Sequence, residues 1–470
     1  MENLKEALRF ICSSNFWRMV LFWNIALLFS YFQLLKKSIF APKSSSSSSC
    51  SKFNHSHTPV CVITGATSGL GKATAFALSR KGFYVVLVGR SSHLLSKTLS
   101  DIKRQNEDAK LKAFEVDMSS FQLVLKFRSS LEQWLFESDL HSSVQLLVNN
   151  AGILATSSRP TVEGFDRMIA TNYVGAFSLT KLLLPLLRNS PVPSRVVNVT
   201  SFTHRSAFTG RFDMDSVTGV NFSRSKQYPC ARIYEYSKLC LLLFSYELHR
   251  QLHLMDDSHH ISVVAVDPGA VKTNIMHELP SYIQVIAFCG LKILGLMQSP
   301  EDAAESVIDA ALAPPEISGK YFFGGRTIES STLSSDPKMA KELWDTSCLI
   351  FNELQEASTP QCVISSLTKP RIIFPNHNPL LCLSTCISER AKTKKGASSV
   401  FVHTFEKMQD MRDQNPPQGY PAAEQVSEQP GQDKKKKKPR FFETKQKGDR
   451  GFIEGCLFAL CCCWICEMCF

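Results

Sequence analysis

Residues 60–71, VCVITGATSGLG, decide the fold, because an apolar segment runs directly into a glycine-rich turn. Val60–Thr64 predicts a buried strand, and residues 72–81 after the turn predict a helix. The glycines allow the tight turn and let the backbone approach a pyrophosphate closely. The N–H groups at the start of the helix are then available to bind that anion. We therefore expect a dinucleotide to contact Thr64, Gly65, Thr67, Ser68, Gly69, Leu70 and Gly71.

Short apolar runs and helix-length segments continue to alternate as far as about residue 355. Further apolar runs lie at 84–88, 144–148, 195–200 and 261–266. Runs this apolar are typical of parallel strands that are covered on both faces. We therefore expect one α/β domain over residues 58–357, a Rossmann-type doubly wound parallel sheet. An apolar stretch at 281–297 predicts an amphipathic lid helix beside the substrate site.

Side chains at the ends of the other strands favour a particular cofactor. The second strand ends at Arg90, where an NAD-specific site carries an acid, and an arginine there suits a 2′-phosphate. NADP(H) is therefore preferred, and NAD(H) is the alternative. Asp117 and Met118 end the next strand, where they could hold the adenine edge. The following strand ends in small residues that leave room for the cofactor ribose, in a segment that contains Asn149, Ala151 and Gly152.

Tyr234 and Lys238 form the predicted acid–base centre, because residues four apart share one face of a helix. A phenol has a pKa near 10, and one adjacent cation lowers a pKa by about 1–3 units. Lys238 and an oxidised nicotinamide would together lower the pKa of Tyr234 to about 7. Lys238 would also hold the nicotinamide ribose. Ser201 would orient the substrate oxygen against Tyr234. Asn172 would kink its helix and bind a water that links Lys238 to solvent.

The order of these residues resembles the classical short-chain dehydrogenase/reductase family over roughly residues 58–355. Residues 64–71 are similar to its cofactor loop, residues 149–152 to its structural motif, and Asn172, Ser201, Tyr234 and Lys238 to its catalytic tetrad. The resemblance also implies a nicotinamide-side loop made by Pro268, Gly269 and Thr273. The long interval between Ser201 and Tyr234 is similar to the branch of retinol dehydrogenases, protochlorophyllide reductases and WW-domain oxidoreductases.

The N-terminal region predicts a membrane anchor. After an N-terminal segment at 1–15, residues 16–37 contain an uncharged run, Met19–Leu35, between Arg18 and Lys36. Its seventeen residues would cover about 26 Å as a helix, and the flanking cations could reach the interface of a ~30 Å hydrocarbon core. A cleaved signal peptide is the alternative, for which the run is long. A serine-rich linker follows at 38–57. More cations follow the uncharged run (Lys36, Lys37, Lys43 and Lys52) than precede it (Lys5, Arg9 and Arg18), which favours a catalytic domain that faces the cytosol from the endoplasmic reticulum or another endomembrane.

The C-terminal region has a different texture. Residues 358–450 are rich in Ser, Pro, Gln and Lys and predict a disordered linker with a lysine run at 434–438. Residues 451–470 carry six of the sixteen cysteines and predict a short apolar Cys-rich helix at a membrane. The plant cysteine-rich transmembrane module resembles this end of the chain, at residues 416–421, at 447–452 and in the cysteine cluster. The module is either a true fusion to the catalytic domain or the product of a neighbouring gene that one gene model has joined to it. The lysines and acylated cysteines would bind a membrane together; a solvated tail and a cysteine metal site are the alternatives.

The sequence as a whole predicts an NADP(H)-dependent oxidoreductase that interconverts a lipophilic alcohol and its aldehyde or ketone. Its expected partners are that small molecule and a membrane. The net charge of +11 includes the C-terminal lysines, and no DNA-reading motif accompanies it, so we expect no nucleic acid and assign no metal site. The alternatives are a catalytically weak NADPH-binding signalling or scaffold protein, and a chain whose role resides in the C-terminal module. The oligomeric state is left open.

Overall fold

The structure is a computed structural model that describes residues 14–40 and 58–358, apart from 139, 209–211, 224, 226, 256–260, 277, 279–283 and 285–289. The N-terminal segment before residue 14, most of the serine-rich linker and everything predicted after residue 358 lie outside the described residues. Residues 281–283 and 285–289 of the predicted lid at 281–297 also lie outside them, while residues 290–293 are helical.

The domain is built on an eight-stranded sheet with the strand order β10-β9-β6-β5-β4-β1-β2-β3, in which β10 alone pairs antiparallel. The strands are β1 (Val60–Thr64), β2 (Tyr84–Gly89), β3 (Lys110–Glu115), β4 (Leu146–Asn149), β5 (Ser194–Val199), β6 (Ile261–Asp267), β9 (Lys320–Phe323) and β10 (Arg326–Ile328). The chain order reverses between β1 and β4, and a crevice outside the carboxyl ends of the strands at such a point is where dinucleotides bind. The predicted doubly wound parallel sheet is confirmed.

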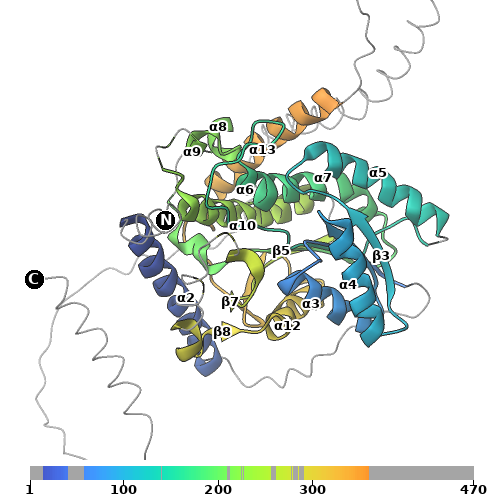
Figure 1. Cartoon of the computed structure of the whole chain (residues 1–470), viewed down its shortest axis with the longest axis horizontal. Coiled ribbons are helices and arrows are strands. Elements are labelled where there is room, and N and C mark those ends of the chain that lie inside the picture. Colours follow the sequence, from blue (N-terminus) through green and yellow to red (C-terminus); the bar gives the residue numbers. More distant parts are fainter. Residues whose placement is uncertain are drawn as a thin grey trace, which may run out of the picture. The chain divides into compact units, whose positions relative to one another are not determined.

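Helices cover both faces of this sheet, as the apolar strands require. Alternate residues of β1 face opposite sides, so that Val60 and Val62 join one buried cluster and Cys61 and Ile63 join another. The first cluster is covered by α5 (Phe121–Glu137), α7 (Gly175–Arg188) and α10 (Cys230–Met255). The second is covered by α3 (Gly69–Arg80), α4 (Ser92–Gln105) and α12 (Pro300–Ala311), as Figure 1 shows.

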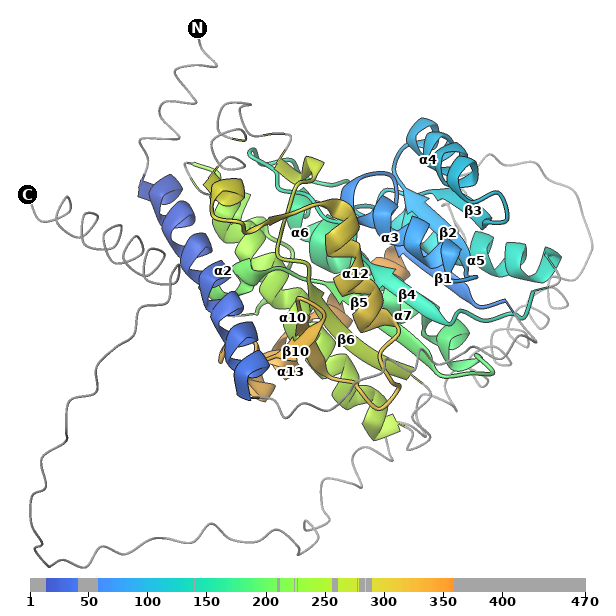
Figure 2. The same cartoon turned by 90° about the horizontal axis from the view of Figure 1, so that it is seen from below.

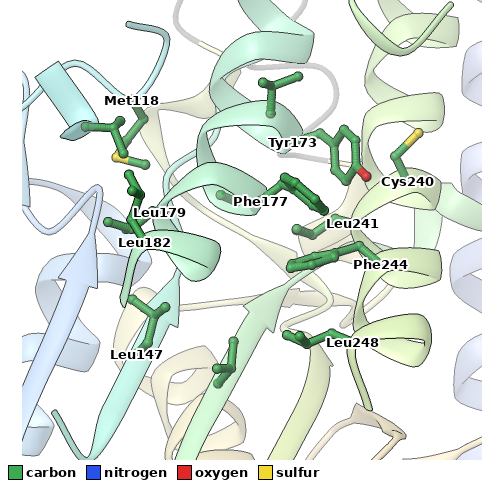
Figure 3. Packing of buried hydrophobic residues seen from close by; sticks show 14 of the residues in the cluster. Met118, Leu147, Tyr173, Phe177, Leu179, Leu182, Cys240, Leu241, Phe244 and Leu248 are labelled. Carbon is green, nitrogen blue, oxygen red and sulfur yellow. The ribbon is translucent and has the colours of Figure 1, made fainter. Parts of the chain in front are cut away.

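The larger cluster fixes the helix that carries the predicted catalytic pair. Phe177 of α7 packs against Phe244 of α10 with ring centroids 5.1 Å apart, and both contact Trp344 of α13 (Pro337–Ser358). Figure 3 shows the α7 and α10 side chains meeting in this layer. Each buried aromatic side chain contributes about 1.5–3 kcal/mol. The central part of α10 is therefore held firmly beside the sheet.

Short elements connect these layers. They are α6 (Arg167–Ile169), the π-helical turn η1 (Ala170–Val174), η2 (Phe202–Ser206), α8 (Met214–Val217), α9 (Val220–Ser223), β7 (Ala270–Val271), η3 (Asn274–Met276) and β8 (Met297–Gln298).

The apolar N-terminal segment forms one long helix, α2 (Ser14–Phe40). Its residues 16–39 are long and apolar enough to cross a membrane, by length and composition. Figures 1 and 2 show α2 lying along the outside of the catalytic domain, and Met19, Ala26, Leu27 and Ser30 are buried there. The predicted N-terminal apolar helix is thus present, with one face packed on the domain.

Candidate active site

The glycine turn after β1 is shaped so that only glycine fits. Gly65 has φ +65° and Gly69 has φ +48°, in the left-handed region that side chains disfavour. A Cβ atom on Gly71 would lie 2.3 Å from the carbonyl oxygen of Gly65. Ser68 precedes α3 in an extended conformation, and its side chain makes no capping hydrogen bond. The first turn of α3 therefore keeps N–H groups that no side chain caps, and these residues fit a pyrophosphate.

The end of β4 is joined to this turn by Asn150. Its amide Nδ2 donates to the carbonyl oxygens of Thr64 (2.8 Å) and Gly65 (3.3 Å). The Thr64 hydroxyl oxygen accepts from the backbone N–H groups of Asn150 and Ala151, both at 3.0 Å. These contacts place Ala151 beside the glycine turn.

Asn149 lies on the other side of the strand. Its amide donates to Thr180 Oγ1 (2.9 Å) and Asn198 Oδ1 (2.8 Å) in the core between α7 and β5. Sequence reasoning chose Asn149 for the cofactor and left out Asn150. The signal was available, because consecutive strand residues point to opposite faces and only one of two adjacent asparagines can face the turn.

Three other predicted cofactor residues border the glycine turn or the next strand end. Arg90 is exposed and follows Gly89, where a Cβ atom would lie 2.7 Å from Thr67 Cγ2. Thr273 lies over the turn, since a Cβ atom on Gly69 would be 2.9 Å from Thr273 Cγ2. The Asp117 carboxylate accepts from Ser119 and from Arg167 Nη2 at 3.0 Å. Burial raises the pKa of Asp117, but these hydrogen bonds outweigh it and hold the pKa below its ordinary value.

The remaining residues predicted to bind the cofactor lie in the packed layer and the loop next to the site. Leu70 and Met118 are buried, and a Cβ atom on Gly175 would lie 2.1 Å from the Met118 carbonyl oxygen, so α7 packs closely there. Pro268 is buried after β6, and Gly269 has φ +75°. This loop therefore turns sharply at the carboxyl end of the sheet.

The predicted catalytic side chains meet where β5 ends and α10 begins: Ser201 follows β5, and Tyr234 and Lys238 lie near the N-terminal end of α10. The Ser201 side chain lies near enough to the Tyr234 hydroxyl to lower the pKa of the phenol, and Ser201 also caps η2. Lys238 lies one turn further along α10, with Nζ donating to the Val199 carbonyl oxygen at 3.0 Å and 5.7 Å from the centroid of the Tyr234 ring. The structure thus brings together a hydroxyl, a phenol and an ammonium.

Asn172 lies in the π-helical turn η1, which interrupts the helix leading into α7. Its amide donates to the Ile153 carbonyl oxygen (3.0 Å) and Ser237 Oγ (3.1 Å). A Cβ atom on Gly152 would lie 3.5 Å from both Asn172 Oδ1 and Lys238 Nζ. Gly152 therefore separates Asn172 from Lys238 by the width of one small residue.

The protein's own groups keep Tyr234 protonated. Burial raises the pKa of Tyr234 well above its ordinary value, and the negative charge of Asp267 raises it further, against the lowering effect of Ser201. Burial also lowers the pKa of Lys238 to about 8. Burial dominates, so Tyr234 is a neutral phenol at neutral pH, the form that can donate a proton. The lowering of this pKa by Lys238 together with an oxidised nicotinamide stays a prediction.

Asp267 is a residue that sequence reasoning missed. It is fully buried at the end of β6, where its carboxylate accepts from the Tyr321 hydroxyl (2.7 Å) and the Gly269 N–H (2.8 Å). Burial raises the pKa of Asp267 to about 6, against these two hydrogen bonds. An acid directly before Pro268 and Gly269 at a parallel strand end was the available signal.

Helix α2 forms a wall beside Tyr234, which the sequence did not predict. The ring centroids of Trp23 and Tyr234 are 5.8 Å apart, and Trp23 Nε1 donates to Glu235 Oε1 at 2.7 Å. Arg18 Nη2 donates to both Glu235 oxygens, at 3.0 and 2.9 Å. Further along α2, the Tyr31 hydroxyl accepts from Gln298 at 3.3 Å, next to Gly269.

The parallel sheet and its glycine turn define the class of dinucleotide-dependent α/β oxidoreductases. Residues 59–211 match the family model for short chain dehydrogenase, and residues 418–470 match the model for the cysteine-rich TM module of stress tolerance. The polyprenol dehydrogenase of Homo sapiens is 30% identical over 296 residues, covering 62% of this chain and 84% of that protein. The polyprenol dehydrogenase of Danio rerio is 33% identical over 297 residues, covering 62% and 86%. Retinol dehydrogenase 13 of Homo sapiens is 29% identical over 287 residues, covering 60% and 81%.

The chain belongs to the short-chain dehydrogenase/reductase family. It is an oxidoreductase of this family, whose members use NAD(P)(H). Its C-terminal residues add a cysteine-rich TM module, and together with α2 this indicates association with a membrane.

Proposed function

We propose that the chain is an NADP(H)-dependent oxidoreductase that interconverts a lipophilic alcohol and its aldehyde or ketone, with Tyr234 as the acid and base. The placement of Ser201 beside Tyr234, with the Lys238 ammonium 5.7 Å from the centroid of the Tyr234 ring, carries this proposal. A phenol within reach of an orienting hydroxyl can exchange a proton with a substrate oxygen. The buried setting keeps that phenol protonated until the reaction demands its proton.

Proton movement in reduction is assigned to side chains of this domain. Ser201 would orient the carbonyl oxygen of the substrate, and Tyr234 would give its proton to that oxygen. Bound NADPH would supply the hydride to the carbonyl carbon. Lys238 would stabilise the phenolate that is left, and Asn172 would hold a water through which the proton is restored. The reverse sequence would oxidise the alcohol.

The cofactor-binding roles are proposed on the shape of the glycine turn. The left-handed Gly65 and Gly69 leave a cradle for phosphate that a Cβ atom at Gly71 would fill. Arg90, exposed after β2, would pair with the 2′-phosphate and so favour NADP(H) over NAD(H). The division of the chain into a membrane-attached segment at 16–37, a catalytic domain at 58–357 and a C-terminal region from 358 belongs to the same proposal.

The lipophilic substrate is supported by relatives named for polyprenol and retinol. Both are long apolar alcohols that dissolve in membranes. The apolar helix α2 beside Tyr234 supports the same class, with the domain held at the endoplasmic reticulum or another endomembrane and facing the cytosol.

Turnover of membrane lipids by the full-length chain tests this function. The purified protein in lipid vesicles would be screened with carbonyl and alcohol lipid extracts, following NADPH absorbance in both directions. Tyr234→Phe is expected to abolish turnover and to keep NADPH affinity. Tyr236→Phe is the matched control, because this tyrosine lies on the same helix and packs against Phe212. Turnover that survives in Tyr234→Phe would remove the mechanism, and NADPH binding with no turnover of any lipid would indicate a binding protein instead.

A further inference from the structure

Helix α2 is held by the catalytic domain at both of its ends. Near its start, Arg18 pairs with Glu235 of α10 at 2.9 Å. Near its end, the Lys37 ammonium donates to the carbonyl oxygen and the hydroxyl of Thr327 in β10. Between them, Arg205 donates to Ser30 Oγ at 3.1 Å. From Arg18 to Lys37 the helix covers about 28 Å, so these contacts extend along the whole segment that could cross a bilayer.

The two faces of α2 differ in kind. The inner face buries Met19, Ala26, Leu27 and Ser30 against the domain. The outer face is an exposed stripe of large apolar side chains, called here the α2 stripe. Its members are Trp17, Phe22, Ile25, Leu28, Phe29, Phe32, Leu35 and Ile39. A continuous apolar surface of this length on a folded domain marks an interaction site.

These contacts are incompatible with α2 crossing a bilayer. A spanning helix is surrounded by ~30 Å of hydrocarbon, with its two ends in separate aqueous phases. Arg18 and Lys37 are instead bound to one folded domain, and Arg205 reaches the middle of the helix. The domain would have to enter the hydrocarbon core for these bonds to survive, which its polar surface forbids.

We propose that α2 lies in the plane of the membrane surface, with the α2 stripe in lipid and its inner face on the catalytic helix α10. The occupant of the stripe is a bilayer with anionic headgroups, because exposed Lys36 lies at one end of the stripe, next to Lys37, whose ammonium Thr327 holds. An in-plane helix binds through buried apolar area together with such charges.

The same placement brings the catalytic residues under the bilayer surface. The Glu235 carboxylate is 1% exposed, and the hydrogen bonds the structure gives it come from Arg18 and Trp23 of α2. Trp23 also packs beside the Tyr234 ring. Helix α2 therefore separates lipid from Tyr234 and positions the turn of α10 that carries it. A lipid substrate could reach Tyr234 from the bilayer along α2, an idea that rests on the proposed function. The in-plane placement of α2 does not rest on it.

Two tryptophans six residues apart on α2 provide a matched test of the placement. Trp17 is on the α2 stripe and 53% exposed, whereas Trp23 faces Glu235. The full-length chain would be reconstituted in phosphatidylcholine/phosphatidylserine vesicles with or without brominated acyl chains, which quench tryptophan in contact with them. The contribution of each tryptophan is the difference in fluorescence between the wild type and the variant that lacks it. We expect bromolipid to quench the contribution of Trp17 at least twofold and to leave that of Trp23 unaffected.

Equal quenching at Trp17 and Trp23 would overturn the in-plane placement, because both rings would then contact lipid. Absence of quenching at Trp17 would also overturn it; light scattering would then show whether a second copy of the chain covers the stripe. NADPH binding by each variant reports that it has folded.

The positions of the two ends of α2 give an independent test. One epitope would be placed at the N-terminus and another in the linker at 41–57, in the full-length chain in sealed microsomes. An in-plane helix predicts that protease removes both epitopes without detergent, whereas a spanning helix protects one of them. Protection of a single epitope would refute the proposal and leave the lipid oxidoreductase intact. If both epitopes are accessible but no turnover depends on Tyr234, the in-plane placement stands and the proposed oxidoreductase mechanism is refuted.

Discussion

The ion pair between Arg18 and Glu235 offers the most demanding prediction. Glu235 is 1% exposed and Arg18 is 21% exposed, so Arg18→Met would leave a buried carboxylate with Trp23 as its remaining hydrogen-bond donor in the structure. Removing one partner of a fully buried pair costs about 3–5 kcal/mol. Because Arg18 is partly open to water, we expect about 2–3 kcal/mol. At roughly 2–4 °C per kcal/mol, Tm should fall by about 4–12 °C.

The assay is thermal unfolding of the full-length chain in detergent, with two comparison variants. Glu235→Gln, which removes the charge and keeps an acceptor, should restore part of the loss when combined with Arg18→Met. Arg128→Met removes a half-buried pair with Glu132, one turn away on α5, and such a pair is worth only about 0.3–0.5 kcal/mol. A Tm for Arg18→Met as close to wild type as that of Arg128→Met would refute the docking of α2 on α10.

Three further predictions concern the catalytic domain. Asp267 raises the pKa of Tyr234, so Asp267→Asn should lower that pKa and move the alkaline rise in the rate of alcohol oxidation to lower pH. The effect should be present above about pH 6, where Asp267 is charged. An unchanged dependence of kcat on pH would contradict this prediction. Arg90→Ala should raise the KM for NADPH roughly 10- to 150-fold through loss of about 1.5–3 kcal/mol and leave the KM for NADH unchanged; equal effects on both cofactors would exclude 2′-phosphate binding. Gly71→Ala places a Cβ atom 2.3 Å from the Gly65 oxygen and should weaken NADPH binding by about 1–3 kcal/mol in a titration, whereas Gly290→Ala, with no atom within 4 Å, should bind normally.

The parts of the fold that could be predicted are those written in local patterns. The run from Val60 to Gly71 combines a strand, a turn that needs left-handed residues and a helix start, and each of these is fixed by neighbours in sequence. The apolar strands indicated a sheet covered on both faces, which β1 shows by sending alternate residues into two clusters. The i, i+4 spacing likewise placed Tyr234 and Lys238 on adjacent turns of α10.

What could not be predicted depends on contacts between distant parts of the chain. Arg18 was interpreted as a cation at the edge of a membrane span, yet its partner Glu235 lies 217 residues away. No local pattern specifies such a pairing, since an acid beside Tyr234 on a helix could equally face solvent. The rise in the pKa of Tyr234 cannot be foreseen from the sequence for a related reason, because burial and the charge of Asp267 arise only when β6 and α10 meet.

Transfer of deuterium from cofactor to lipid would show whether Tyr234 gives its proton to a lipid carbonyl that NADPH reduces. The full-length chain in vesicles would be given NADPH deuterated at both C4 positions and a lipid carbonyl found in the screen, and the alcohol would be analysed by mass spectrometry. We expect one deuterium on the carbinol carbon with the wild type, and no deuterated alcohol with Tyr234→Phe while NADPH still binds. Deuterated alcohol formed at an undiminished rate by Tyr234→Phe would contradict this expectation.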